Sequence, residues 1–145
     1  MYDAMDIAEY VLDYCENIKE KPITNLQLQK ILYYIQGKFI KKTKKPIFDN
    51  SIEAWQYGPV VPEVYYWFNK FVSEPITGVE KSKNVKFSNE EIKLIEEVIS
   101  ENIDLDPWQL VKKTHDELPW KKNYVSNLNL EISYDDLKNF FDREN

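Results

Sequence analysis

The segment Ile23-Thr24-Asn25-Leu26-Gln27-Leu28 carries the signals that start a helix. The Thr24 side chain can accept a hydrogen bond from the backbone amide of Gln27 while the Gln27 side chain reaches back, which is the pattern of a capping box. Ile23 and Leu28 stand at the positions of a hydrophobic staple. Apolar residues then recur at helical spacing: Leu28, Ile31, Leu32, Ile35 and Phe39. The segment therefore predicts a helix with an apolar inner face.

The same start signal occurs three more times along the chain. Each occurrence places a capping residue three positions before a side chain that can reach back, although the last uses Asp where Glu is usual. The three pairs are Ser88 with Glu91, Asp106 with Gln109, and Ser133 with Asp136. Pro107 stands at the first helical position of the second pair, where its missing N–H has no cost. Helices are therefore predicted after residues 24, 88, 106 and 133.

Apolar spacing predicts two further helices and little strand. A first helix, capped by Asp3, has its inner face at Ala4, Ala8, Val11, Leu12 and Cys15. Another begins at Pro62 and has its inner face at Val64, Trp67, Phe68 and Phe71. Short strands are expected only at 52–57 and 85–87, and residues 72–86 are predicted to form a long exposed loop. The predicted fold is mainly α, a compact single-domain bundle of about six helices over residues 1–145 with a minor short β element.

Composition narrows the chemistry that this chain can perform. Its 145 residues carry a formal net charge of −6, and 43% of them are hydrophobic, which suits one soluble domain with a core. One histidine and one cysteine cannot build a four-ligand zinc site or a disulfide framework, and three glycines leave no phosphate-binding loop. No apolar run is long enough to span a bilayer, and the N-terminus lacks the features of a signal peptide. We therefore expect a cytoplasmic protein without a metal or a cofactor.

An unusual aromatic stretch reads Ala54-Trp55-Gln56-Tyr57-Gly58-Pro59-Val60-Val61-Pro62. The Gly58-Pro59 pair is expected to stop the preceding strand, since Pro59 lacks an amide and biases Gly58 toward an extended geometry. Two large aromatic side chains beside a rigid turn could form a binding surface at low entropic cost. The simpler alternative places Trp55 and Tyr57 in the core, as is general for large aromatic residues.

A second stretch, Thr114-His115-Asp116-Glu117-Leu118-Pro119-Trp120, places the only histidine of the chain beside carboxylates. His115 could act as a general base whose pKa these carboxylates raise. No serine or cysteine nucleophile is linked to it by a local motif, and catalysis requires a constellation rather than one titrating group. We therefore favour a structural role, with His115 at the C-terminus of a helix that Pro119 ends, and expect no catalytic residue.

Two charged clusters offer further alternatives. One is a group of lysines that could contact phosphates but also suits the C-terminus of a helix. Its members are Lys38, Lys41, Lys42, Lys44 and Lys45. Net negative charge and a single arginine disfavour a nucleic-acid partner. The helix after Ser88 has an acidic face that could steer a basic partner or keep the protein soluble; it comprises Glu90, Glu91, Glu96, Glu97, Glu101 and Asp104.

Taken together, these motifs resemble the Panacea-domain proteins, which include SocA-like antitoxins and prophage-associated proteins. The resemblance rests on Asp6-Ile7-Ala8-x-Tyr10-Val11-Leu12, on Ile23 to Tyr34, on Pro46-Ile47-Phe48-Asp49, on Glu53 to Tyr65, and on Thr114-His115-x-Glu117-x-Pro119-Trp120. These segments span nearly the whole chain in family order. The resemblance implies a mainly helical antitoxin domain without catalytic residues, which neutralises a cognate protein toxin by direct binding.

The resemblance also implies an alternative function, because some members act as adaptors that deliver a client protein to a protease. Many relatives carry an additional N-terminal segment, whereas here the resemblance begins within the first few residues, so autoregulation of transcription by the chain itself is not expected. The candidate partner-binding or motif residues are Trp55, Tyr57, Gly58, Pro59, Val60, Thr114, His115, Glu117, Pro119 and Trp120. We assign no oligomeric state from the sequence.

The two aromatic stretches are expected to meet in space, since a small domain with one core offers few other places for both turns to bury their rings. Trp55 and Trp120 would then belong to one aromatic cluster, with His115 hydrogen-bonded at its edge. Tyr57 is the residue of this region that we expect to be exposed and available to a partner.

Overall fold

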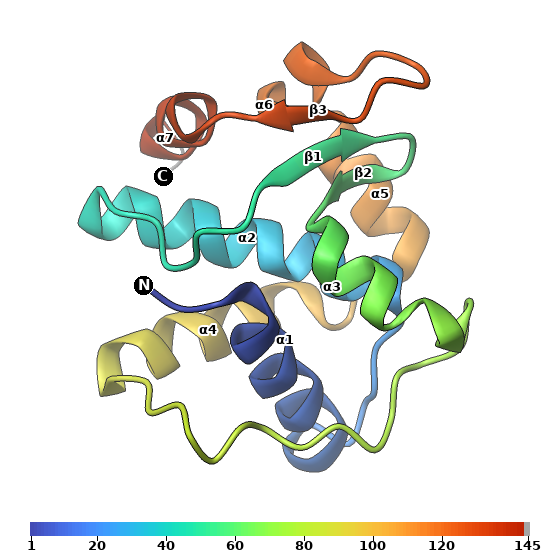
Figure 1. Ribbon diagram of the computed structural model, residues 1–145, viewed down its shortest axis with the longest axis vertical. Coiled ribbons are helices and arrows are strands. Elements are labelled where there is room, and N and C mark those ends of the chain that lie inside the picture. Colours follow the sequence, from blue (N-terminus) through green and yellow to red (C-terminus); the bar gives the residue numbers. More distant parts are fainter. Residues whose placement is uncertain (144–145) are drawn as a thin grey trace.

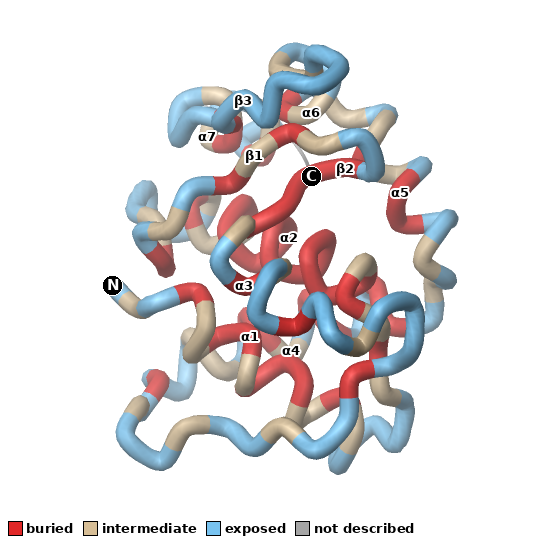
Figure 2. Tube along the Cα trace, turned by 45° about the vertical axis from the view of Figure 1, so that its right-hand side comes forward, coloured by how far each residue is buried: buried red, intermediate tan, exposed pale blue. Residues whose placement is uncertain are grey.

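A long central helix, α2 (Asn25–Thr43), organises the computed structural model, which describes residues 1–143 of the chain. Every residue of α2 from Gln27 to Gly37 is buried, so this helix has no solvent-facing side over that length. It crosses the middle of the molecule in Figure 1 and is mostly buried in Figure 2. Its predicted capping box is confirmed, with the Gln27 amide 3.2 Å from Thr24 Oγ1 and the Thr24 amide 2.8 Å from Gln27 Oε1.

The remaining helices surround α2, and α1, α3, α4, α5 and α7 pack directly on it. Their bounds are α1 (Ala4–Asp13), α3 (Pro62–Trp67), α4 (Asn89–Asn102), α5 (Pro107–His115), α6 (Leu118–Asn123) and α7 (Tyr134–Arg143). A π-helical turn, Tyr14–Ile18, extends α1, and a 3₁₀ turn, Asn69–Phe71, follows α3. The predicted mainly helical class is confirmed. Residues 1–143 form seven α-helices rather than about six, and the additional one is α6.

A small antiparallel sheet covers the side of α2 opposite to α1 and α4 (Figure 1). Its strands are β1 (Ile52–Trp55), β2 (Gly58–Val60) and β3 (Leu130–Ile132), in the order β2-β1-β3. Trp55 pairs with Gly58, so residues 56 and 57 form a two-residue hairpin turn. The expectation that Gly58-Pro59 stops the strand is therefore wrong. Gly58 is the first residue of β2, with φ +113°, and Pro59 lies on this edge strand, where a missing amide is tolerated.

Three other expectations are corrected by packing. Residues 85–87 form no strand. The apolar residue Phe87 is instead explained by the packing of its ring on those of Tyr2 and Tyr10, at 4.7 and 5.6 Å between centroids. Trp67 is 64% exposed, because α3 ends there and the following 3₁₀ turn changes which residues face inward. Pro119 does not end a helix but lies in the first turn of α6, a position that suits proline.

The other three predicted helix starts are confirmed, two with both capping hydrogen bonds and one with a single capping hydrogen bond. Both reciprocal hydrogen bonds form at Ser88 with Glu91 and at Asp106 with Gln109. At the fourth site, Ser133 Oγ accepts from the Asp136 amide, but the Asp136 carboxylate instead accepts from Lys122 and Asn123 of α6. The predicted exposed loop at 72–86 is also present, anchored by a hydrogen bond from the Ile76 amide to the Ile23 carbonyl.

Polar side chains on the buried part of α2 bind the backbone of the segments around it. Gln29 accepts from the Val61 amide at 2.9 Å, and Gln27 donates to the Leu105 carbonyl at 3.0 Å. Gln36 accepts from the Ile47 amide and donates to the Phe48 carbonyl, each at 2.9 Å. Since buried polar groups are stable only when they are hydrogen-bonded, these contacts fix the position of each segment on the helix.

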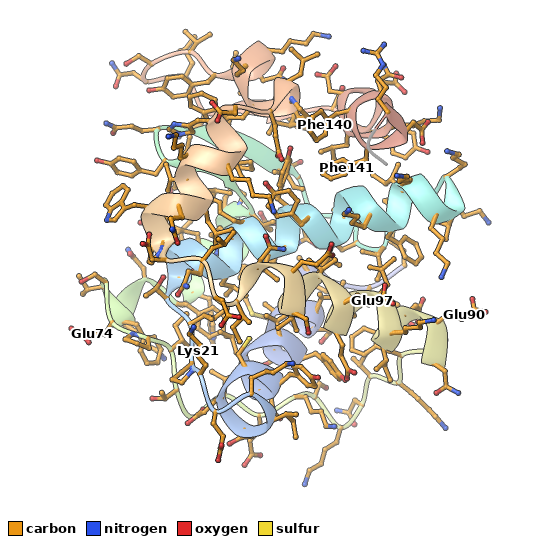
Figure 3. All side chains as sticks on the ribbon, turned by 180° about the vertical axis from the view of Figure 1, so that it is seen from behind. Lys21, Glu74, Glu90, Glu97, Phe140 and Phe141 are labelled. Atoms are coloured by element: carbon orange, nitrogen blue, oxygen red, sulfur yellow. The ribbon has the colours of Figure 1, made fainter. Side chains whose placement is uncertain are left out.

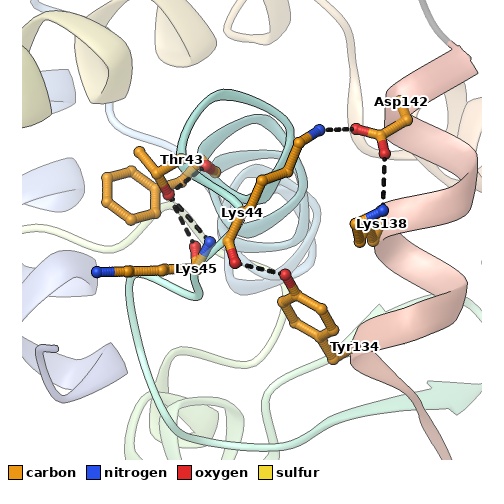
Figure 4. Close-up of polar contacts among 7 residues, drawn as sticks. Thr43, Lys44, Lys45, Tyr134, Lys138 and Asp142 are labelled. Carbon is orange, nitrogen blue, oxygen red and sulfur yellow. Dashed lines mark hydrogen bonds and ion pairs between the residues drawn. The ribbon is translucent and has the colours of Figure 1, made fainter.

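Helix α7 holds the C-terminal end of α2, where the lysine cluster lies (Figure 4). Lys44 ends α2 in the left-handed conformation, and its carbonyl accepts a 2.6 Å hydrogen bond from the Tyr134 hydroxyl. Its ammonium pairs with Asp142 at 2.6 Å, and Lys138 pairs with the same carboxylate. Part of the lysine cluster is thus engaged within the protein. Within residues 1–143, no helix combines the length and apolar character needed to cross a membrane.

Gly37 allows α7 to approach α2 closely, and this predicts an unusual mutational effect. A Cβ at residue 37 would lie 2.1 Å from the ring of Phe141, which points from α7 toward α2 (Figure 3). Gly37→Ala should therefore destabilise the protein by about 1–3 kcal/mol, despite the better helix propensity of Ala.

Chemical denaturation in two backgrounds checks this prediction. In Phe141→Ala, where the ring is absent, the same Gly37→Ala change should be neutral or stabilising. An equal loss in the free energy of unfolding in both backgrounds would show that the α2–α7 contact does not limit the size of the side chain at residue 37.

Candidate functional site

The two aromatic stretches do meet, as expected from the sequence. Trp120 in α6 donates a 2.7 Å hydrogen bond from Nε1 to the carbonyl of Trp55, 65 residues away in β1. At the start of β2, a Cβ on Gly58 would lie 2.6 Å from Lys30 Cε and 2.7 Å from Thr114 Oγ1. Both close packing and a positive φ therefore require glycine at this position.

The rings form two groups rather than the single aromatic cluster that was expected. Trp120 stacks on His115 at 3.8 Å and on Tyr124 at 4.7 Å. The Trp55 ring instead contacts Tyr65 and Tyr66 of α3, at 5.2 and 5.7 Å. The link between the groups is the hydrogen bond to the Trp55 backbone, because the Trp55 side chain packs against α3.

Half of the ten candidate motif residues lie inside the protein. Gly58, Pro59, Val60, Thr114 and Pro119 are buried, which leaves them no surface for a partner in the folded protein.

Glu117 holds the α5–α6 turn against α2. Its two carboxylate oxygens accept hydrogen bonds from the hydroxyls of Tyr33, at 3.0 Å, and Tyr34, at 2.9 Å. Since Glu117 is the N-cap residue of α6, this pair of bonds sets where α6 begins.

Lys30 is a fully buried amine between α2 and β2. Its Nζ donates a 3.2 Å hydrogen bond to the carbonyl of Pro59. Burial lowers the pKa of Lys30 to about 7. Sequence reasoning missed this residue, because a lysine within an apolar helical pattern gives no sign of whether its amine reaches solvent.

His115 does not have the environment of a general base with a raised pKa. Burial lowers its pKa, the nearby Lys30 lowers it further, and the Gln56 backbone and Asp116 oppose these effects. Its Nε2 is buried and, within the part of the chain that the structure describes, has no hydrogen-bond partner. The general-base alternative assumed a raised pKa, whereas burial and the nearby Lys30 amine outweigh the Gln56 backbone and the Asp116 carboxylate.

The single thiol also has a buried environment. Cys15 lies in the π-helical turn after α1, and burial raises its pKa to about 12. A thiol with a raised pKa is a poor nucleophile, so Cys15 is not suited to that role.

One face of the site is an open apolar groove, which we call the aromatic groove. It has a volume of about 410 Å³ and lies where the hairpin turn, the segment after α3, and the first turns of α2 and α5 meet. Its apolar lining residues are Leu26, Tyr57, Tyr65, Val72, Pro107 and Trp108; Thr24, Asn25, Ser73 and Asp106 complete it. Tyr57 and Trp108 pack edge to face at 5.3 Å and are 47% and 61% exposed.

Tyr57 is thus exposed as expected, whereas Trp108 was not identified from the sequence as a surface residue. The start signal Asp106-Pro107-Trp108-Gln109 located a helix but carried no information about what its first turn faces.

A second surface lies along the acidic face of α4. Glu90, Glu97 and Glu101 are exposed there, and Figure 3 shows Glu90 and Glu97 on the outer side of the helix. Glu91 and Glu96 instead accept 2.6 Å hydrogen bonds from the hydroxyls of Tyr2 and Tyr10. Asp104, which was expected on this helix, lies beyond the end of α4 and pairs with Lys21 at 2.9 Å. Part of the acidic cluster is therefore structural, and Glu90, Glu97 and Glu101 form a negative outer face.

Replacement of Trp120 should test the link between the two stretches. Trp120→Ala removes the hydrogen bond to Trp55 and both stacking contacts, so we expect a loss of about 3–5 kcal/mol in the free energy of unfolding. Trp120→Phe retains a stacking ring and should lose less. Trp108→Ala, at an exposed position, is the matched control and should leave the melting temperature unchanged. Unchanged melting of Trp120→Ala would contradict the described packing.

The buried amine of Lys30 predicts a pH dependence of stability. Its pKa is about 7 in the folded protein and near 10.5 when unfolded, so between these values the unfolded chain binds one proton more. Stability should therefore rise with pH from about 7 to about 9.

Denaturation of Lys30→Met across this range should show a flatter pH profile, because the titrating amine is gone. Lys44→Met, which removes an exposed amine, should keep the wild-type profile. A profile in Lys30→Met as steep as the wild type would assign the pH dependence to other groups.

Comparison with known proteins agrees with the sequence motifs. Residues 28–121 match the family described as "Antitoxin SocA-like, Panacea domain". A segment of 67 residues is 40% identical to Antitoxin SocA of Caulobacter vibrioides (strain NA1000 / CB15N), and it covers 46% of this chain and 35% of that protein. Among solved structures, none matches the chain. Because the family match covers more than half of the residues, including both aromatic stretches, the chain belongs to the SocA-like Panacea-domain family of antitoxins.

Proposed function

We propose that this protein is an antitoxin that neutralises a cognate protein toxin by direct, non-catalytic binding. The matched relative carries the name antitoxin, but the chain spans only about a third of its length, so its activity enters here as part of the proposal. The observation that carries the proposal is the division of the site into a buried scaffold and an exposed aromatic surface.

This division favours protein binding over catalysis. His115, Lys30 and Cys15 could supply a base or a nucleophile, but His115 Nε2, the Lys30 amine and the Cys15 thiol are buried. Tyr57 and Trp108 of the aromatic groove are instead presented to solvent. Tyr and Trp are the residues that most often dominate the binding energy of protein interfaces.

We propose that residues 1–145 act as one Panacea-type domain, although the family match begins at residue 28 and ends at residue 121. In support, α1 and α7, which lie outside the match, both pack on α2 and complete the burial of that helix.

We also propose a cytoplasmic location. The net charge of −6 and the acidic face of α4 favour a toxin with a basic surface.

The second candidate function is an adaptor that binds a toxin and delivers it to a protease. The observation that favours it is the presence of two surfaces with no residue in common, the aromatic groove and a groove along the acidic face of α4. An adaptor needs two such surfaces, whereas neutralisation by binding needs one.

Co-expression with the protein encoded by the adjacent gene tests the proposed function. We expect the neighbour to be toxic alone and harmless beside this protein. Tyr57→Ala should lose protection and binding in pull-downs without a change in melting temperature, because Tyr57 is exposed. Tyr66→Ala, also exposed but outside the groove, is the control and should protect.

A neighbour that is harmless alone, or that stays toxic beside this protein, would refute the proposal for this gene pair. Pulse-chase of the neighbour distinguishes the two candidates: its half-life should shorten in the presence of an adaptor and stay the same or lengthen with simple binding.

A further inference from the structure

We propose that the aromatic groove binds an amphipathic helix of the toxin, one whose apolar face is flanked by lysine or arginine side chains. This inference rests on the proposed antitoxin function and adds the chemistry of the partner. It depends on the shape of the groove, on a strained residue at its edge, and on the charges that border it.

The groove has the size and lining of a binding site. Its volume of about 410 Å³ is within the range of about 300–1,000 Å³ that is usual for ligand pockets. Tyr57 and Trp108 hold each other edge to face, so their rings are preorganised before a partner arrives. Rigid aromatic side chains lose little conformational entropy on binding, which favours affinity.

Val72 at the edge of the groove is both strained and exposed. Its φ of 57° and ψ of −116° are unusual for a β-branched residue, and its side chain is 79% exposed. A strained backbone combined with an exposed apolar side chain is unfavourable for folding. Such features persist mainly where they serve a functional site, and here the side chain extends the apolar lining of the groove.

The surroundings of the groove favour a helix over an added strand. The strand that follows Tyr57 is the edge strand β2, but its three residues are buried and Pro59 has no amide to donate, so its edge is not open to an added strand. The partner must therefore bind through side chains, as an amphipathic helix does when it places its apolar face in a groove.

Charges beside the groove favour a basic flank on that helix. Asp106 lines the groove, and Glu74 lies two residues after Val72; both are exposed, and neither forms a salt bridge within residues 1–143. Glu74 points outward in Figure 3. The lysine of the same segment, Lys70, has its Nζ over the rings of Trp67 and Phe71, at 6.0 and 5.9 Å from their centroids. Its charge is therefore directed at these rings and does not pair with Glu74.

Two synthetic helical peptides of equal length test this inference on the purified full chain. One is built from leucine and lysine and the other from leucine and glutamate, and binding is measured by fluorescence anisotropy at about 150 mM salt. We expect the Leu/Lys peptide to bind and the Leu/Glu peptide to bind about tenfold more weakly or not at all. Equal affinities, or stronger binding of the Leu/Glu peptide, would overturn the proposed basic flank.

Matched variants test the groove itself. Trp108→Ala should weaken binding of the Leu/Lys peptide by about tenfold or more. Trp67→Ala, which removes an equally exposed tryptophan outside the groove without changing the charge, should leave it within about twofold. Similar losses in both variants, or in neither, would overturn the assignment.

Two further variants separate strain and charge from folding. Val72→Gly should raise the melting temperature, since glycine tolerates this backbone, and yet weaken peptide binding. Glu74→Gln combined with Asp106→Asn keeps a residue that can cap α5, and it should weaken binding and reduce its salt dependence. Tighter or unchanged binding in either variant would overturn the role given to that residue.

The toxin assay distinguishes failure of this inference from failure of the proposed function. If wild type protects against the adjacent gene product but Trp108→Ala protects equally well, the antitoxin function stands and the groove assignment is overturned. If wild type itself fails to protect, the function is refuted for that gene pair, and the peptide experiments still decide the chemistry of the groove.

Discussion

The burial of α2 on all sides from Gln27 to Gly37 is the constraint on which the rest of the structure depends. Over this length the polar side chains of α2 must be satisfied inside the protein, and its glutamines bind the backbone of the surrounding segments. Gln27, Gln29 and Gln36 bind the segments before α5, before α3 and before β1. These bonds give the connecting segments defined positions, so turns that would otherwise be free to move become parts of a rigid site.

The aromatic stretches follow from the same constraint. Lys30 and Glu117 are the charged groups that connect α2 with them, one bonded to the carbonyl of Pro59 and the other accepting from Tyr33 and Tyr34. Trp120 then joins the two stretches through the carbonyl of Trp55. Most residues that identify the family therefore contact one another and support the exposed surface beside them.

That surface combines features that are unfavourable for an isolated protein. Large aromatic side chains are exposed beside a strained valine, although burial of the same rings would stabilise the fold. The groove lies beside the first turns of α2 and α5, whose positions the buried bonds hold in place, so its shape is maintained while it is open to solvent. A rigid groove on a rigid scaffold suits recognition that depends on preorganisation.

Local signals in the sequence determined where the helices begin and which class of fold results. A capping box needs only neighbours three residues apart, so Thr24, Ser88 and Asp106 could be identified without any knowledge of tertiary contacts. The proximity of the two aromatic stretches could also be predicted, because a small core has few places for large rings. Only the tertiary structure decided that Gly58-Pro59 belongs to a hairpin and that Lys30 is buried. It also decided that burial lowers the pKa of His115 and that Trp67 and Trp108 face solvent. Each of these depends on which distant segment lies nearby, and that information is not contained in local spacing.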